Sequence, residues 1–268
     1  MAGGIGAVKK TVIVPGAVSA TFKKLPMTAD EIIALLVECG LKAVEWSENA
    51  HVQPDDPAGA AELRRKTEAV GLSVAAYGSY FRLGENELPG AAFARSLASA
   101  KALGAPLMRV WAGARGSGEV SDLQFCCLAQ EAALIAEMAA RQGIKVAFEW
   151  HKNTLTDTNE SAWRLLREAD HPNLYCLWQP TVALSPRERT AGIRMLGDRL
   201  ANLHVYSWPD GKRGPLNAAE WQYYLDAAEA VGGRRCALLE FVRDDSLEQF
   251  RADARTLLNL LESGEYNG

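Results

Sequence analysis

Three apolar segments of this chain each carry a side chain of a type that binds metal ions. Glu149 and Glu240 each close such a segment, and His204 lies within a third. A carboxylate at the end of an apolar strand is poorly placed for a hydrophobic core. It is well placed where the C-terminal ends of several parallel strands converge on one cavity. The three side chains are therefore candidate ligands of a single metal site.

The elements that must position these residues alternate along the chain. Apolar runs rich in β-branched residues predict strands at 11–14, 42–46, 72–77, 106–111, 144–149, 174–178, 200–206 and 236–242. Helical apolar spacing predicts helices at roughly 29–39, 58–70, 91–103, 121–142, 158–169, 186–198, 218–231 and 245–263. Residues 78–88, after the third strand, are expected to form a long loop. Regular alternation of this kind predicts a parallel sheet.

Local signals support these boundaries. Thr28 and Glu31 have the spacing of a capping box at the start of the first helix. Glycines that can adopt the left-handed conformation stand where helices give way to strands, at Gly40, Gly71, Gly104 and Gly143. Eight β/α units predict an α/β fold of the (β/α)8 TIM barrel type. A doubly wound open sheet is the competing fold, but residues 14–17 lack the G-x-G-x-x-G turn that usually follows its first strand.

Length and composition limit the remaining possibilities. The 268 residues show no linker-like composition break, which favours one domain over 1–268 with 1–10 as a flexible N-terminal tail. The net charge of −4 disfavours a nucleic-acid surface, and a small-molecule partner fits better. We expect no apolar run of membrane-spanning length. The five cysteines lack C-x-x-C spacing, so we expect reduced thiols and a cytoplasmic location.

With Glu149, His204 and Glu240 on predicted strands five, seven and eight, the chain resembles the xylose isomerase-like TIM barrel superfamily. That group includes sugar phosphate isomerases and epimerases, ketose 3-epimerases, hydroxypyruvate isomerase-like proteins and endonuclease IV. Its sugar epimerases hold a divalent cation with a Glu, an Asp, a His and a Glu from strands five to eight. The resemblance implies the same ligand roles for Glu149, His204 and Glu240, with Mn²⁺, Mg²⁺, Co²⁺ or Zn²⁺ as the ion.

Strand six departs from the family pattern, since Gln179 stands where the epimerases have their Asp. A neutral amide oxygen can coordinate a hard cation, but it removes one negative charge from the site. The substrate-binding His that follows that Asp in the epimerases has no counterpart in residues 181–184. Gln179 is therefore a candidate fourth ligand, and the substrate class is left open.

The resemblance implies a metal-dependent sugar isomerase or epimerase. Glu149 and Glu240 would remove and return a proton next to the metal-polarised carbonyl, through an enediolate. One alternative is a metal-dependent keto-sugar lyase or dehydratase that forms the same enolate and expels a β-substituent. Another is a non-catalytic sugar-binding barrel. An endonuclease IV-like enzyme is disfavoured, because it needs three metal ions and this acidic chain has only four histidines.

Aromatic and basic residues near the predicted strand ends are candidate substrate contacts. Trp111, Trp150 and Trp208, together with Trp178, would form aromatic walls that stack on sugar C–H surfaces, although they could instead cap the barrel. His151 follows Glu149 into the mouth.

Two basic residues after strand seven, Lys212 and Arg213, resemble the Arg that sugar epimerases carry in that loop, with a solvated basic turn as the alternative. Arg109, inside strand four, is expected to form a structural ion pair. The oligomeric state is left open, with a homo-oligomer as one option.

Overall fold

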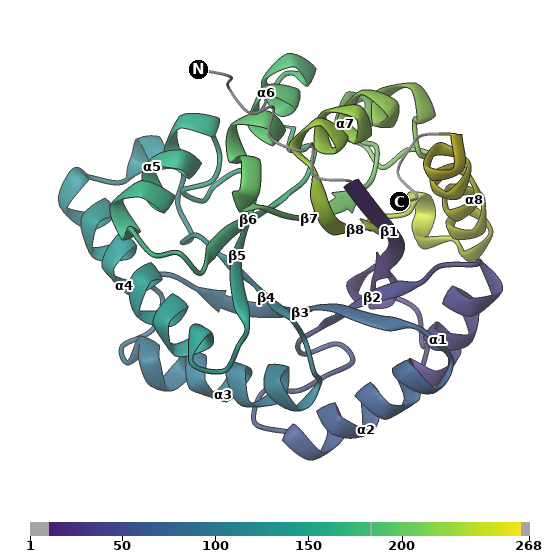
Figure 1. Ribbon diagram of the computed structural model, residues 1–268, viewed down its shortest axis with the longest axis horizontal. Helices are drawn as coiled ribbons and strands as arrows, with labels where there is room; N and C mark the ends of the chain where they lie inside the picture. The colour runs from purple at the N-terminus through teal and green to yellow at the C-terminus, as the bar shows by residue number, and fades with distance from the viewer. Residues whose placement is uncertain (1–10, 183, 264–268) are drawn as a thin grey trace, which may run out of the picture.

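The described residues, 11–182 and 184–263 of a computed structural model, form eight parallel strands closed into a barrel, with a helix after each strand (Figure 1). The strands are β1 Thr11–Val18, β2 Ala43–Ser47, β3 Ser73–Arg82, β4 Leu107–Trp111, β5 Lys145–Glu149, β6 Leu174–Trp178, β7 Leu200–Val205 and β8 Gly233–Leu239. The helices are α1 Ala29–Glu38, α2 Pro57–Ala69, α3 Pro89–Ala102, α4 Asp122–Ala140, α5 Asn159–Ala169, α6 Pro186–Leu196, α7 Ala218–Val231 and α8 Leu247–Ser263. The predicted TIM barrel is confirmed.

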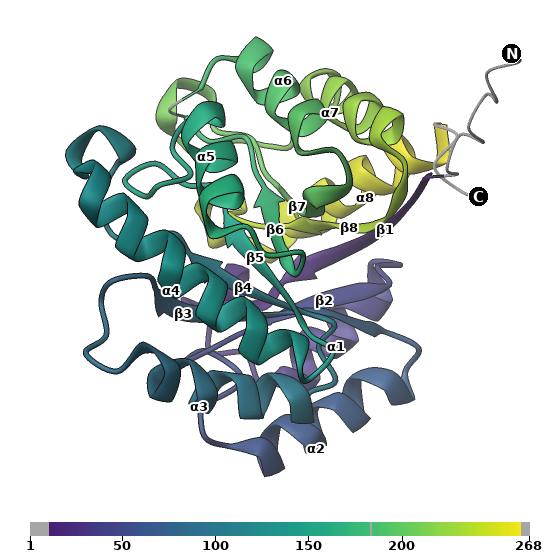
Figure 2. The ribbon, with the colours of Figure 1, turned by 60° about the vertical axis from the view of Figure 1, so that its left-hand side comes forward.

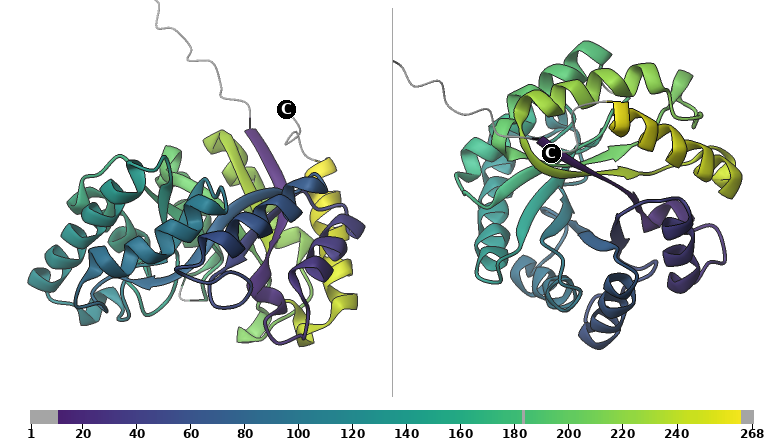
Figure 3. Two further views of the ribbon diagram at one scale, coloured as in Figure 1. Left: turned by 90° about the horizontal axis from the view of Figure 1, so that it is seen from below. Right: turned by 45° about the vertical axis from the view of Figure 1, so that its right-hand side comes forward.

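The ring closes between its first and last strands. Parallel pairing of β1 with β8 runs from Thr11 opposite Gly233 to Ala17 opposite Leu239. The helices lie outside the strands in every view (Figure 2, Figure 3). Because all strands run in the same direction, their C-terminal ends meet at one mouth. The tail expected at 1–10 lies outside the described residues.

The predicted helix signals form as expected. The Thr28 side chain accepts a hydrogen bond from the backbone of Glu31, whose carboxylate accepts from the Thr28 backbone N–H at 2.7 Å. Gly40 ends its helix with φ of 75°. That left-handed conformation is open to glycine at little steric cost, which explains why a glycine marks this helix-to-strand switch.

Two strands differ from their predicted limits in ways that shape the mouth. β3 continues to Arg82, where a loop was expected, because its pairing with β4 is irregular between Gly78 and Arg82 and resumes opposite Trp111. β8 begins and ends earlier than predicted, so Glu240 follows the strand. The Glu240 backbone N–H still donates to the carbonyl of Val205 at 2.9 Å, which ties it to β7.

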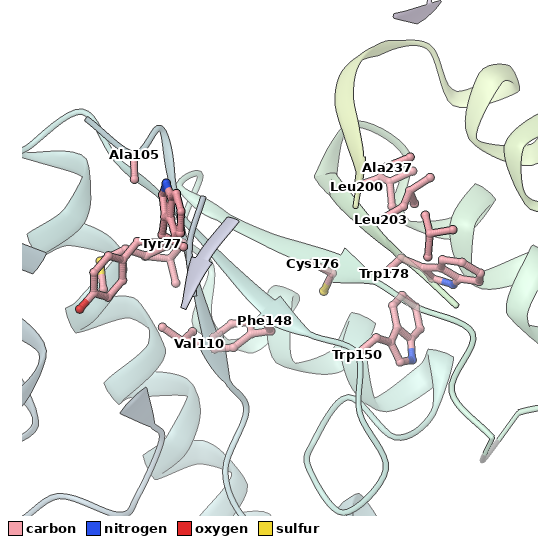
Figure 4. Close-up of a cluster of buried hydrophobic side chains, with 14 of the residues drawn as sticks. Tyr77, Ala105, Val110, Phe148, Trp150, Cys176, Trp178, Leu200, Leu203 and Ala237 are labelled. Carbon is pink, nitrogen blue, oxygen red and sulfur yellow. The ribbon is translucent and has the colours of Figure 1, made fainter. Parts of the chain in front are cut away.

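Side chains alternate between the barrel interior and the layer beneath the helices. Phe148, Trp150 and Trp178 belong to the large apolar layer between strands and helices (Figure 4). Small apolar side chains form separate clusters inside the barrel, among them Ala147 and Leu177. Because side chains alternate, the residue after Phe148 and the residue after Trp178 point into the barrel. These residues are Glu149 and Gln179, so the barrel interior is polar near its mouth.

Helix α4 is long and apolar enough, by length and composition, to cross a membrane, contrary to the expectation that no run reaches that length. It is nevertheless one of the crossover helices of the barrel. Its buried residues, including Phe125, Ala132 and Ile135, lie on one face at helical spacing. The core helix of a globular domain passes the same test, so α4 is weak support for a membrane span.

Candidate active site

Four candidate ligands come together at the C-terminal mouth of the barrel. Glu149 ends β5, Gln179 follows β6, His204 lies near the end of β7 and Glu240 follows β8. All four are buried, and His204 has no exposed surface. One ligand atom from each of Glu149, His204 and Glu240 lies within 4.8 Å of the other two. Carboxylate oxygens and an imidazole nitrogen at this spacing can share one divalent cation.

The same four side chains hold buried polar atoms that lack a hydrogen-bond partner among the described residues. These atoms are Glu149 Oε2, Gln179 Oε1, His204 Nδ1 and Glu240 Oε2. Three of them still have a charged neighbour, since Glu149 Oε2 lies 3.1 Å from Arg109 Nη1 and His204 Nδ1 lies 3.1 Å from Glu240 Oε2. The Gln179 amide is oriented by its Nε2, which donates to the Trp150 carbonyl at 2.7 Å and to Glu149 Oε1 at 3.1 Å. Its Oε1 is consequently left free. A buried acceptor without a donor is costly, and a cation shared with Glu149, His204 and Glu240 would satisfy Gln179 Oε1.

A further buried acid that was not predicted from the sequence, Glu45 on β2, also lies at this site. Its side chain has no exposed surface, and its Oε2 lies 3.2 Å from His204 Nε2. An ionised carboxylate only accepts hydrogen bonds, so a neutral His204 would carry its proton on Nε2, facing Glu45. The lone pair of Nδ1 would then point toward Glu240, whose Oε2 is 3.1 Å away. The available signal was a carboxylate near the end of an apolar run, the same signal that identified Glu149.

The ion pair expected for Arg109 is confirmed, and it joins two acids. Arg109 Nε donates to Glu45 Oε1 at 3.2 Å, and its Nη1 lies 3.1 Å from Glu149 Oε2. Gly78 gives this pair room, because a Cβ there would lie 2.6 Å from Glu45 Oε1 and 2.8 Å from Arg109 Nη2. Arg109 therefore balances charge beneath the candidate metal site.

Charge pairing controls the titration of the buried groups. Burial disfavours a charged His204, but Glu240 and Glu45 outweigh that cost and raise its pKa to about 10. Burial alone would raise the pKa of Glu45, yet His204 and Arg109 hold it below its usual value. Without a cation, His204 is thus the second positive charge, after Arg109, among the acids.

Trp111 and His151 lie together at the β4 and β5 side of the mouth. Their ring centroids are 4.6 Å apart, and the Arg82 guanidinium lies 3.8 Å from the centre of the Trp111 ring. His151 Nδ1 faces the carbonyl oxygen of Lys152, which leaves Nε2 as the atom that can meet a substrate. Trp111 and His151 thus lie against each other after β4 and β5, and their roles as substrate contacts stay predictions.

Trp208 lies across the mouth in an aromatic cluster with Tyr206 and Phe241. Trp208 is 5.5 Å from Tyr206 and 5.3 Å from Phe241, measured between ring centroids. Tyr206 and Trp208 also line a cavity of about 490 Å³. Burial, together with the carboxylates of Glu240 and Glu149, raises the pKa of Tyr206 well above its usual value. This cavity adjoins the candidate ligands through Tyr206.

Other expected substrate contacts are placed differently. Trp150 and Trp178 are buried in the layer beneath the helices (Figure 4). Each is next in sequence to a residue that points into the barrel, so its own side chain points outward. They do not form the aromatic wall that was expected of them. Arg213 pairs with Asp245 and lies 5.2 Å from the Phe241 ring, while Lys212 is exposed.

Comparison with known proteins gives a short sequence match and long structural ones. A 3-dehydroshikimate dehydratase of Bacillus anthracis is 40% identical over 67 residues, which is 25% of this chain and 24% of that protein. The match thus spans about a quarter of the relative. The crystal structure of the probable 3-DHS dehydratase involved in petrobactin synthesis from B. anthracis has a TM-score of 0.78 at 16% identity, covering 92% of this chain and 99% of that one.

Two further structures share the fold at low identity. D-Psicose 3-epimerase from Clostridium cellulolyticum H10, solved with D-tagatose, has a TM-score of 0.69 at 15% identity, covering 95% of this chain and 99% of that one. The IOLI protein with a bound zinc atom has a TM-score of 0.72 at 12% identity, covering 93% of this chain and 98% of that one.

The family match is broader than any of these sequence similarities. It covers residues 33–260, from the first helix to the last, and therefore includes all four candidate ligands. The closed parallel barrel of this chain agrees with the TIM barrel that the family description names. The chain belongs to the xylose isomerase-like TIM barrel family.

Proposed function

We propose that this protein is a divalent-metal-dependent lyase of the dehydratase type that acts on a small polyhydroxylated ketone. The observation that carries the proposal is the gathering of Glu149, His204 and Glu240, whose ligand atoms lie within 4.8 Å of one another. The buried Gln179 beside them has an Oε1 without a hydrogen-bond partner among the described residues. These residues would hold the ion, and the zinc-bound IOLI structure supports a metal in this fold. When bound, a cation such as Mn²⁺, Mg²⁺, Co²⁺ or Zn²⁺ polarises a carbonyl and stabilises the enolate formed beside it.

Glu240 is the base that we assign to remove the proton alpha to the substrate carbonyl. Its Oε2 faces His204, so Oε1 is the oxygen directed to this task. Glu149 is less free, because Gln179 donates to its Oε1 and Arg109 lies against its Oε2. Glu149 thus supports the proposed ligand set rather than the proton transfer.

His151 is the acid that we assign to the departing hydroxyl. Its Nδ1 is engaged by the Lys152 carbonyl, and the ring lies against Trp111. A protonated Nε2 would give its hydrogen to the leaving oxygen, so that water departs and the C–O bond breaks as the enolate electrons form the new double bond. The proton taken by Glu240 and the proton given by His151 balance the elimination.

Two observations favour elimination over epimerisation. The curated sequence relative is a dehydratase. In addition, epimerisation needs a proton donor on each face of the carbon, and the second carboxylate, Glu149, is held at both oxygens. The sugar isomerase or epimerase remains the second candidate, because Glu149 and Glu240 approach the site from different strands with oxygens within 4.8 Å of a common ligand set.

Deuterium exchange and metal content test the proposal together. With 3-dehydroshikimate and a panel of ketoses in D₂O, we expect metal-dependent loss of water and a near-ultraviolet absorbing product. An epimerase would instead return a deuterated isomer. Glu240→Gln should lose both bound metal and turnover, whereas Glu248→Gln, an exposed acid on α8, should keep both. Unchanged metal content in Glu240→Gln and His204→Ala would refute the metal site.

Absence of metal and of turnover in the unmodified protein would favour the non-catalytic sugar-binding barrel.

A cytoplasmic location is part of the proposal as well. It is supported by the five cysteines, which lack the C-x-x-C spacing of a disulfide or metal motif. Fractionation of cells that express the protein checks this point.

A further inference from the structure

We propose that the substrate carries an oxyanion group, a carboxylate or a phosphate, and that Arg82 binds it. The inference deepens the proposed function, on whose active site it rests. It starts from the charges around the mouth. Arg109 is committed to Glu45 and Glu149, and Arg213 to Asp245. Arg82 is different.

Arg82 has no carboxylate partner among the described residues. Its guanidinium donates from Nη1 to the Gly113 carbonyl at 3.4 Å and lies 3.8 Å from the centre of the Trp111 ring. An arginine has five N–H donors in a planar fork. Most of that fork is therefore available to a ligand, on a side chain that is only half-exposed.

The backbone at Arg82 is held by its neighbours, and the Trp111 ring and the Gly113 carbonyl hold the guanidinium. Arg82 pairs with Trp111 at the irregular end of β3, and the Leu83 N–H donates to the Trp111 carbonyl at 3.1 Å. Asn86 donates to the Arg82 carbonyl at 3.2 Å. An arginine fixed on an aromatic face loses little entropy when it binds, and its fork matches carboxylate and phosphate oxygens.

The Trp111 ring connects this arginine to the proposed chemistry. Trp111 contacts both Arg82 and His151, and His151 comes two residues after Glu149. A substrate that meets His151 can thus place a charged substituent on Arg82.

Paired ligands that differ only in the oxyanion test the inference. The probes are 3-dehydroshikimate against its methyl ester, and a ketopentose against its 5-phosphate, titrated calorimetrically into metal-free and Mn²⁺-loaded protein. We expect the anionic member of one pair to bind about 10- to 100-fold tighter than its neutral partner, the scale of charge-assisted hydrogen bonds. The pair that shows the preference identifies carboxylate or phosphate.

Arg82→Met should abolish that preference while leaving metal content and affinity for the neutral probe unchanged. Arg82→Lys should retain part of it, because the charge remains but the planar fork is lost. Arg115→Met is the matched control, since it removes an exposed charge from the following loop and should keep the full preference.

Equal binding of both members of each pair would overturn the inference, as would a full preference in Arg82→Met or failure of both anions to bind. These binding ratios do not depend on turnover. The proposed function can therefore fail, through absent metal or exchange, while the oxyanion preference stands, and the reverse outcome is equally recognisable.

Discussion

Neighbouring residues on the same strands of this barrel lie in two very different environments. Phe148 lies in the apolar layer beneath the helices, whereas Glu149, the next residue, points into the mouth. Leu203 and His204 repeat this contrast on β7. The apolar layer consists of buried hydrophobic side chains, whereas the barrel end gathers buried charged and polar ones, among them Gln179, whose Oε1 has no hydrogen-bond partner among the described residues.

The contrast teaches that packing and chemistry are divided between the two faces of each strand. The apolar layer stabilises the fold by removing hydrocarbon from water. The barrel end retains unsatisfied lone pairs, which is costly for the fold and useful for a site that is completed by a ligand. Substitutions on the two faces should therefore respond differently to added metal.

Phe148→Ala should give the largest loss of stability. Removal of a fully buried phenyl ring costs about 3–5 kcal/mol in free energy of unfolding, through lost transfer energy and the cavity left behind. Chemical denaturation with and without Mn²⁺ measures it. The metal should add the same increment to variant and parent, because the site is intact. If Mn²⁺ raised the free energy of unfolding of the variant more than that of the parent, the two faces would be energetically coupled.

Glu45→Gln should weaken metal affinity about 10- to 100-fold, because the carboxylate that orients His204 is lost. Competition with a chelator measures the affinity, and ¹⁵N shifts of His204 should show a changed tautomer balance. Glu48→Gln is the matched control. Glu48 is also buried after β2, but its oxygens accept from Tyr77 and the Tyr80 backbone. Equal effects of both variants on affinity would show that Glu45 is merely structural.

The pH dependence of the metal-free protein's stability should also distinguish the two faces. His204 has a folded pKa raised to about 10 from an ordinary value of 6.5. A raised folded pKa contributes stability that is fully present below about pH 6.5 and is lost as the pH rises toward 10. Denaturation in EDTA should show this decline, and His204→Gln should flatten it. Stability that rises over the same interval would contradict the charge pairing.

Thiol reactivity is the mildest test. Burial raises the pKa of the Cys176 thiol, in the apolar layer, to about 12. Cys126 and Cys127 are exposed on α4. Ellman's reagent at pH 8 should label the exposed pair quickly and Cys176 only after unfolding. Rapid labelling of Cys176 in native protein would show that the layer opens readily.

Much of the fold follows from local sequence signals. Apolar runs, the capping residues of Thr28 and Glu31, and glycines such as Gly40 predict most element boundaries closely, because these signals act within a few residues of one another. Expectations fail where pairing with another strand decides the outcome. β3 reaches Arg82 because β4 lies beside it, which the sequence of 78–88 does not encode locally.

The candidate site divides in the same way. The sequence by itself identified Glu149, His204 and Glu240, because a polar residue that closes an apolar strand is a local pattern. Only the tertiary structure brought Glu45 under His204 and set Arg82 on Trp111, since those contacts join residues from different strands. It also turned Trp150 away from the mouth, because alternation along a strand assigns each side chain a face only after the barrel has closed.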